Sequence, residues 1–358
     1  MQPNEISEAI RLAGLPVPDS DIEITGSDPI YYSPFRLGEG AAVVHALVGS
    51  KIDELWKLAG HEPQKLDIDI RNAAASLNSM SWLSLEKMPE NFRNQSMTRI
   101  YRCGDGRFFH LHNSFVDGPV VANQLGIDED SDVATIAQAM AKQDAFELEK
   151  ALISLKVTGA VVRSPEEWLD HPQGKALANR PVVEITKIGD APVESPKAGA
   201  RPLSNLRVLD LTRVLAGPTS ARTLAEHGAQ VLHISSPNLP TMMMAEMDTG
   251  HGKRQAHLDL TTREDEAKLL DLVNDVDVFN QGFRKGTLDK RGFGPEAMAE
   301  LRPGIIYVSE NCYGHQGPWA ERPGWEQLAQ TVSGVAQLQG ELAPLLPDRE
   351  RLVAAGEN

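Results

Sequence analysis

Segment 207–234, RVLDLTRVLAGPTSARTLAEHGAQVLHI, has the pattern with which nucleotide-binding domains usually begin. The pattern predicts a strand, a tight turn, a helix and a second strand. In the turn, Ala216 and Gly217 place a small and a permissive residue before the helix, and Pro218 stands near its first position. Such a turn presents backbone N–H groups to an anion or to an adenine edge. An ordinary strand-to-helix turn is the alternative interpretation.

Other patterns that could carry chemistry are incomplete. The turn TRVLAGPTS lacks the three glycines of G-x-G-x-x-G, so we do not expect a nicotinamide enzyme. His110 and His112 point to one face of a strand, but no third ligand is in sight, so we expect a structural hairpin and no metal site. Two cysteines, Cys103 and Cys312, are too few for a disulfide framework and are typical of a reducing compartment.

Composition and charge narrow the class of protein. A chain of 358 residues with 41% hydrophobic and 24% charged residues is typical of a globular protein with two domains, or with one domain and a large insertion. The net charge of −15 opposes a general role on nucleic acid or on an anionic membrane. The N-terminus does not resemble a secretory signal, and no stretch approaches the roughly 18 apolar residues of a membrane span. We therefore expect a cytoplasmic protein.

Strands and helices alternate regularly in the second half of the chain. Strand-like RVLDL, QVLHI, DVDVF and GIIYVS are separated by helical segments, which predicts a parallel sheet covered by helices. Thr261 and Glu264 are expected to form a capping box at the start of one of these helices. The first half predicts one long helix from Gly38 to about Leu58, then a strand and a second helix. A smaller α+β domain is expected to begin at a hairpin whose turn is CGDG.

Several of these segments resemble one family, the class III CoA-transferases or CaiB/BaiF family. VLDLTRVLAGP, GKRQAHLDLTT and the stretch from DVFNQGFRKG to LAQTVSG, between Val208 and Gly334, are similar to the family's N-terminal half. GAAVVHALVG, GDGRFFHLH and VRSPEEWLDHPQGKAL resemble its other end, so the two halves stand in exchanged order. Either the chain is a permuted single copy, or it is part of a longer protein whose second copy is cut short at Asn358.

The resemblance implies a fold and a reaction. The fold is α/β, with a doubly wound, Rossmann-like large domain formed by 1–100 and 190–358 and a small α+β domain at 101–189. The implied assembly is an interlocked homodimer. The implied substrates are an acyl-CoA and a carboxylic acid, with coenzyme A as carrier and no metal. In this reaction a carboxylate attacks the thioester to form a mixed anhydride, captures CoA as an enzyme thioester, and passes it to the acceptor acid.

Matching positions imply a CoA site. Because CoA is anionic at its 3′-phosphate and pyrophosphate, the site needs Arg or Lys side chains and backbone donors. The resemblance places these residues near CoA: Leu215, Ala216, Gly217, Pro218, Lys253, Arg254, Phe283, Arg284, Lys290, Arg291, and Gly314 and His315 of the loop GHQGPW. Each of these Lys and Arg residues, taken singly, could be a solvated surface charge. Together, at positions that match the family, they favour CoA binding. Ser236 stands where the family often has Arg or Lys.

The position of the family's nucleophile is taken by a glutamate. Glu39 in LGEGAA matches the family's catalytic Asp, and Glu357 holds the analogous place at the other end. Glu39 is expected at a helix start, which stabilises a carboxylate. Glu is longer than Asp by one methylene, so a non-catalytic helix-start acid is the alternative. A CoA-binding relative without activity also stays open. An acyl-CoA racemase or epimerase is weakened, because Gly324-Trp325-Glu326 replaces the family's G-H-D segment.

Overall fold

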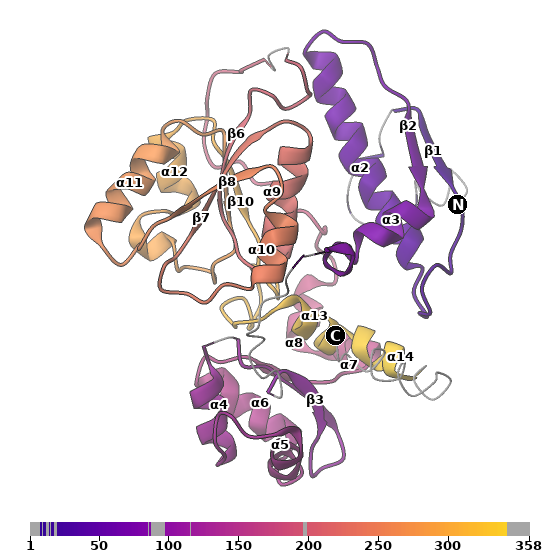
Figure 1. Ribbon diagram of the computed structural model, residues 1–358, viewed down its shortest axis with the longest axis vertical. Helices are drawn as coiled ribbons and strands as arrows, with labels where there is room; N and C mark the ends of the chain where they lie inside the picture. Colours follow the sequence, from indigo (N-terminus) through magenta and orange to yellow (C-terminus); the bar gives the residue numbers. More distant parts are fainter. Residues whose placement is uncertain are drawn as a thin grey trace. The chain divides into compact units, whose positions relative to one another are not determined.

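The computed structural model describes residues 20–84, 97–114, 116–195 and 199–341, with a few single positions outside these ranges. The chain forms two compact units (Figure 1). The first comprises Met1–Ser84 and Arg180–Glu310, and the second comprises Leu85–Asn179 and Asn311–Asn358. Among the described residues, no helix has the length and apolar character needed to cross a membrane.

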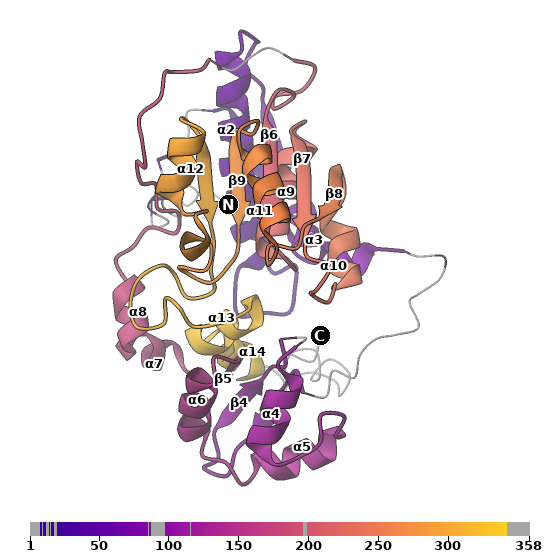
Figure 2. The same cartoon turned by 90° about the vertical axis from the view of Figure 1, so that its left-hand side faces the viewer.

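A five-stranded parallel sheet forms the centre of the first unit. Its strands are β6 (Arg207–Leu211), β7 (Gln230–Ser235), β8 (Lys253–His257), β9 (Val278–Gln281) and β10 (Ile306–Ser309). They lie in the order β10-β9-β6-β7-β8, and Figure 2 shows β9, β6, β7 and β8 side by side. In parallel sheets whose order reverses in this way, ligands bind outside the carboxyl ends of the strands at the reversal. The predicted α/β class with a parallel sheet is confirmed.

Helices cover both faces of this sheet (Figure 1). They are α9 (Ala216–Glu226) and α10 (Met243–Thr249) on one side, and α11 (Arg263–Val273) and α12 (Pro295–Leu301) on the other. Side chains alternate along a strand, so Leu209 and Leu211 pack in the cluster that contains Leu269 of α11. Val208 joins the cluster of Ala221 on α9. The apolar strands of the sequence are therefore buried on both faces.

The N-terminal segment adds a helix to the sheet unit. Its elements are β1 (Ile22–Thr25), α2 (Leu37–Leu58), β2 (Leu66–Asp69), α3 (Ile70–Ser76) and the 3₁₀ helix η1 (Ser79–Trp82). Val48, Ile52 and Leu55 of α2 recur at helical spacing and pack in the cluster of Val208 and Ala221. β1 and β2 pair in parallel beside the other end of α2. The predicted long helix, and the strand and helix after it, are confirmed.

The predicted capping box at α11 is wrong by one residue. The N-cap is Thr262, whose side chain accepts the N–H of Asp265 at 3.3 Å. The hydroxyl of Thr261 donates to Asp259 at 2.6 Å. Because Asp259 holds Thr261 in the preceding turn, the helix starts one position later than the T-x-x-E pattern indicates.

The second unit is an antiparallel sheet, ordered β3-β4-β5, with helices around it. Its elements are β3 (Arg99–Arg102), β4 (Phe108–Leu111), α4 (Gly118–Leu125), α5 (Val133–Met140), α6 (Ala145–Ser154), β5 (Gly159–Val161), α7 (Pro165–Asp170), α8 (Pro172–Leu177), α13 (Glu326–Ser333) and α14 (Val335–Glu341). The N–H of Cys103 donates to the carbonyl of Arg107 at 2.8 Å, which closes the predicted CGDG hairpin.

The division into units differs from the predicted domains at the end of the chain. We expected 190–358 in the large domain, whereas Asn311–Asn358 is grouped with the second unit. Arg322 donates to Glu149 at 3.2 Å and to the carbonyl of Gly159 at 2.6 Å. Trp319 packs in the same cluster as Ala160. These contacts fill the core of the second unit, so the segment after β10 leaves the parallel sheet.

Candidate functional site

The turn between β6 and α9 has a backbone that few residues could adopt. Val214 has a φ of +70°, in the left-handed region that β-branched residues avoid. A Cβ atom added at Gly217 would lie 2.3 Å from Cγ2 of Thr212 and 2.4 Å from Oε1 of Glu310. Only glycine fits there, which explains the permissive residue of the sequence motif. Strain of about 1–3 kcal/mol at such positions persists where the surroundings hold it, often at functional sites.

A buried carboxylate at the end of β6 holds this turn. Asp210 is fully buried, and its Oδ1 accepts the N–H of Thr212 at 3.1 Å and the amide of Asn280 at 3.3 Å. Its Oδ2 lies 2.9 Å from Nζ of Lys253 and 3.3 Å from Nδ1 of His233. Burial alone would raise the pKa of Asp210, but the nearby His233 ring and the Lys253 charge keep that pKa below its usual value. The carboxylate therefore connects four segments of the unit.

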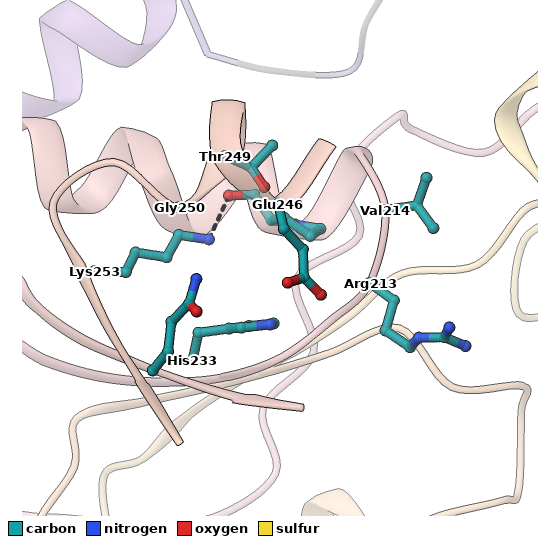
Figure 3. A pocket seen from close by; sticks show the side chains of 9 residues that line it. Arg213, Val214, His233, Glu246, Thr249, Gly250 and Lys253 are labelled. Carbon is teal, nitrogen blue, oxygen red and sulfur yellow. Dashed lines mark hydrogen bonds between the residues drawn. The ribbon is translucent and has the colours of Figure 1, made fainter. Parts of the chain in front are cut away.

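Lys253 ties β8 to the start of α9 (Figure 3). Besides its contact with Asp210, Nζ donates to the carbonyl of Pro218 at 2.8 Å, and the side chain is only 2% exposed. Burial lowers the pKa of Lys253 in spite of the nearby Asp210 charge. The predicted CoA residue Lys253 thus uses its ammonium group to position the Ala216–Pro218 turn.

A small pocket of about 10 Å³ adjoins Lys253, close to the room that one water molecule needs. Figure 3 shows Lys253, His233 and Glu246 converging on it. Arg213 also lines the pocket and donates to the carbonyl of Pro240 at 2.7 Å. Burial lowers the pKa of Arg213. Two cationic side chains that line the pocket, Lys253 and Arg213, therefore already donate hydrogen bonds to protein carbonyls.

The remaining predicted cations lie in different surroundings. Arg254, Arg284 and Lys290 are exposed, as a phosphate-binding side chain must be before its ligand arrives. Arg291 donates to the carbonyl of Leu260 and pairs with Glu266 at 3.3 Å, which fixes the 3₁₀ helix η2 (Asp289–Arg291) against the start of α11.

Phe283 is half-buried against the cluster between the sheet and α11. Its N–H donates to Oε1 of Gln281 at 2.8 Å. That bond fixes the loop directly after β9. Leu215 forms the N-cap of α9 without a side-chain hydrogen bond, so the first N–H groups of α9 depend on other partners.

The candidate nucleophile Glu39 lies in the first turn of α2, as predicted. Its N–H donates to Asp28 at 2.9 Å, and its side chain is 4% exposed and paired with Arg36. Asp28 also accepts the N–H of Gly38 at 3.2 Å, so it caps the helix from a distant position in the sequence. The Glu39 carboxylate is thus enclosed by protein. Glu357 lies outside the described residues.

Gly314 and His315 belong to the second unit, in a loop held by one side chain. Gly314 has a φ of +78°, and Nδ1 of His315 lies 3.1 Å from the amide of Asn311. Gln173 donates to the carbonyls of Tyr313 at 2.7 Å and Gln316 at 2.6 Å, and accepts the N–H of Trp319 at 2.7 Å. Sequence reasoning missed Gln173, and a single glutamine in HPQGKAL gives no signal of this role.

His110 and His112 act within the second unit as hairpin residues. Nδ1 of His110 lies 2.8 Å from Oγ1 of Thr331, and Nε2 of His112 lies 3.2 Å from Oε1 of Gln327. Burial lowers the pKa of His110 to about 3 and that of His112 to about 4. Within the described part of the chain, no group of three or more His, Cys, Asp or Glu residues could hold a metal ion.

Sequence reasoning also missed the polar residues that surround the β6–α9 turn. Asp210, Asn280 and Glu310 come from β6, from β9 and from the residue after β10. The available signal was a polar residue inside or just after an otherwise apolar strand, as in VLDLT and DVFNQ. Carboxyl ends of neighbouring parallel strands meet at one edge, so such residues gather there.

The parallel order and this turn define an α/β protein of the class that binds ligands at the carboxyl edge of its sheet. Comparison with known families is more specific: residues 203–352 match the family model described as CoA-transferase family III. The resemblance recognised in the sequence is confirmed, and the chain is a relative of the class III CoA-transferases.

Relatives extend the match through both halves of the chain. An acyl-CoA transferase of Gibberella moniliformis is 32% identical over 90% of this chain and 64% of its own length. The acetyl-coenzyme A transferase nodX of Hypoxylon pulicicidum is 31% identical over 78% of this chain and 52% of its own length. A crystal structure of a CaiB/BaiF family protein from Brucella suis shares 32% identity over 38% of this chain and 40% of that one, with a TM-score of 0.34.

The chain therefore spans roughly half to two thirds of these two fungal relatives' lengths.

Proposed function

We propose that the protein transfers CoA between an acyl-CoA thioester and a carboxylic acid. The observation that carries this proposal is the family match over 203–352, which contains the whole β6–α9 turn and the lysine that holds it. The finer expectations belong to the proposal as well: a doubly wound, Rossmann-like large domain, an interlocked homodimer, and a cytoplasmic location. The relatives' names support CoA transfer in general and leave the acyl group open.

The residues near the turn fit an anionic, partly apolar ligand. Arg254, Arg284 and Lys290 are exposed and can meet phosphate oxygens, while the half-buried Phe283 offers an apolar surface. Lys253 and Arg291 act differently, because their cationic groups are already bonded to the protein. In this proposal they position backbone segments that CoA contacts.

Glu39 is the proposed nucleophile. Its carboxylate would attack the thioester carbonyl, release the CoA thiolate and form a mixed anhydride. The thiolate would then attack the Glu39 carbonyl, which forms an enzyme–CoA thioester and releases the donor acyl group as its carboxylate. The acceptor carboxylate would attack this thioester to form a second anhydride, and the released thiolate would attack the acceptor's acyl carbonyl, which yields the new acyl-CoA and frees Glu39. This role requires the carboxylate to leave its enclosed position beside Arg36.

Enclosure of Glu39 favours a second candidate, a relative that binds CoA without transferring it. Calorimetry with CoA and a transfer assay with acetyl-CoA and a panel of carboxylic acids distinguish the two. Transfer by the wild type that is lost in Glu39→Gln supports the enzyme with this nucleophile. The exposed Glu54 of the same helix provides the matched control, Glu54→Gln. Transfer that persists in Glu39→Gln removes Glu39 from the mechanism, and CoA binding without transfer supports the second candidate.

A further inference from the structure

Glu310 lies across the start of α9, although it follows the edge strand β10, which is separated from β6 by β9. Its N–H donates to the carbonyl of Gln281 at 3.2 Å, which fixes its backbone beside β9. Its Oε1 is 2.4 Å from the position of a Cβ at Gly217 and 3.2 Å from that of a Cβ at Gly282. Two glycines in different loops therefore leave the space that this carboxylate fills.

The contacts of the carboxylate are those of an anion at a helix start. Oε1 of Glu310 stands where a side chain of residue 217 would begin, so the carboxylate lies against the first turn of α9. Burial, and then the negative charge of Asp210, raise the pKa of Glu310, while the backbone of Gly217 opposes this change. The nearby cationic groups of Lys253 and His233 contact the carboxylate of Asp210. In the described ranges, no Lys, Arg or His side chain forms an ion pair with Glu310 itself. The carboxylate therefore lies against the turn, and within the described part of the chain no cation pairs with it.

We propose that Glu310 is a specificity-determining residue of the CoA site, whose carboxylate lies against the β6–α9 turn and opposes the approach of anionic groups of CoA to this turn. The inference rests on the proposed function, since it assumes that CoA binds at the β6–α9 turn. Two like charges at close range repel each other strongly in a partly desolvated site. Neutralising Glu310 therefore strengthens CoA binding, which is the opposite of what loss of a ligand contact would do.

Calorimetric titration of the full chain with CoA tests this inference at low ionic strength, where charge effects are least screened. The test variant is Glu310→Gln, which keeps the shape and removes the charge. The matched control is Glu296→Gln, a carboxylate in the first turn of α12 in the same unit. We expect Glu310→Gln to lower the Kd for CoA about tenfold, equivalent to about 1.4 kcal/mol. The control should keep the wild-type Kd.

The outcomes separate this inference from the proposed function. Equal or weaker CoA binding by a folded Glu310→Gln variant, with binding by the wild type intact, overturns the role of Glu310 alone. An equal increase in CoA affinity in Glu296→Gln also overturns it, because the effect would then come from the net charge of the protein and not from the position of Glu310 at the turn. Absence of CoA binding in the wild type and in both variants overturns the CoA site and this inference together.

Discussion

The ammonium group of Lys253 lies 2.9 Å from the carboxylate of Asp210, and both side chains are nearly inaccessible, with 2% and 0% exposed. The pair joins the first residue of β8 to β6, and through the carbonyl of Pro218 it also reaches the start of α9. A buried pair of this kind adds little to stability by itself, but removal of one partner leaves a buried charge without compensation. Its value here is positional, because it fixes the turn at which the proposed ligand binds.

Replacement of Lys253 tests this positional role. We expect Lys253→Met to lower the free energy of unfolding by about 3–5 kcal/mol, because the buried Asp210 carboxylate loses the positive charge of Lys253. The neighbouring Arg254 is exposed, so Arg254→Met should stay within about 0.5 kcal/mol of the wild type. Urea denaturation measures both values. If Lys253→Met were as stable as Arg254→Met, the ion pair would not hold the turn.

The space around Gly217 gives a second prediction. A methyl group there would meet both Thr212 and Glu310, so Gly217→Ala should cost about 1–3 kcal/mol of stability through overpacking. The same variant should weaken CoA binding, since the turn must shift. Gly40, inside α2, has no atom within 4 Å of an added Cβ, and Gly40→Ala should stabilise by about 0.5–1 kcal/mol. Thermal unfolding measures the two changes in stability, and calorimetry measures the affinity of each variant for CoA. Unchanged CoA affinity in Gly217→Ala would remove the turn from the site.

The sequence predicts secondary structure correctly where a local pattern of apolar, glycine and proline residues is enough to determine it. The strand–turn–helix at 207–226 follows from apolar runs and from glycine and proline at the turn, so these elements are predictable from the sequence. The partners of Lys253 are not, because Asp210 and Pro218 meet it only when β6 and β8 are folded into one unit. The family register places Lys253 near CoA, and the structure adds that its ammonium group bonds to Asp210 and to the carbonyl of Pro218.

Contacts between residues far apart in the sequence also explain why the domain prediction differs at the end of the chain. The order of family segments predicts that the segment after β10 belongs to the large domain, but its placement depends on contacts at long sequence separation. Arg322 is buried beside Glu149, and its guanidinium lies 4.0 Å from the centre of the Trp319 ring. The sequence around Arg322 gives no sign that its partner is Glu149, and the sequence around Glu149 gives no sign of Arg322. Charge and ring contacts of this kind become visible only in the folded unit.

Acid should destabilise the second unit through its buried histidines. The pKa of His110 is about 3 and that of His112 about 4, both below the unfolded value of about 6.5. The unfolded chain therefore binds more protons at low pH. Stability is full above about pH 6.5 and should fall by about 1.4 kcal/mol per pH unit for each histidine, down to the folded pKa. Urea denaturation between pH 7 and 4 measures the slope.

Variants identify the source of that slope. His110→Gln should remove about half of the pH dependence assigned to this pair. His45 lies on α2 in the other unit, and it is exposed. His45→Gln should therefore leave the slope unchanged. A slope equal to that of the wild type in His110→Gln would show that other groups cause the acid sensitivity.

Gln173 offers the sharpest test of how the loop with Gly314 and His315 is held. The side chain is fully buried, and its three hydrogen bonds go to the backbone of Tyr313, Gln316 and Trp319. Gln173→Leu keeps the approximate volume and leaves these three groups without that partner. The expected loss is about 3 kcal/mol, from about 1 kcal/mol for each bond. Amide hydrogen exchange at residues 311–320 should accelerate, because the loop opens locally more often.

An exposed glutamine provides the control for that experiment. Gln330 lies exposed on α13 and bonds to Glu326 of the same helix, so Gln330→Leu should change the free energy of unfolding by no more than about 0.5 kcal/mol. If the loop takes part in CoA transfer, as the family resemblance implies, Gln173→Leu should also lower the transfer rate at a temperature where the variant is still folded. A folded Gln173→Leu protein with wild-type exchange in the loop would show that other contacts position Gly314 and His315.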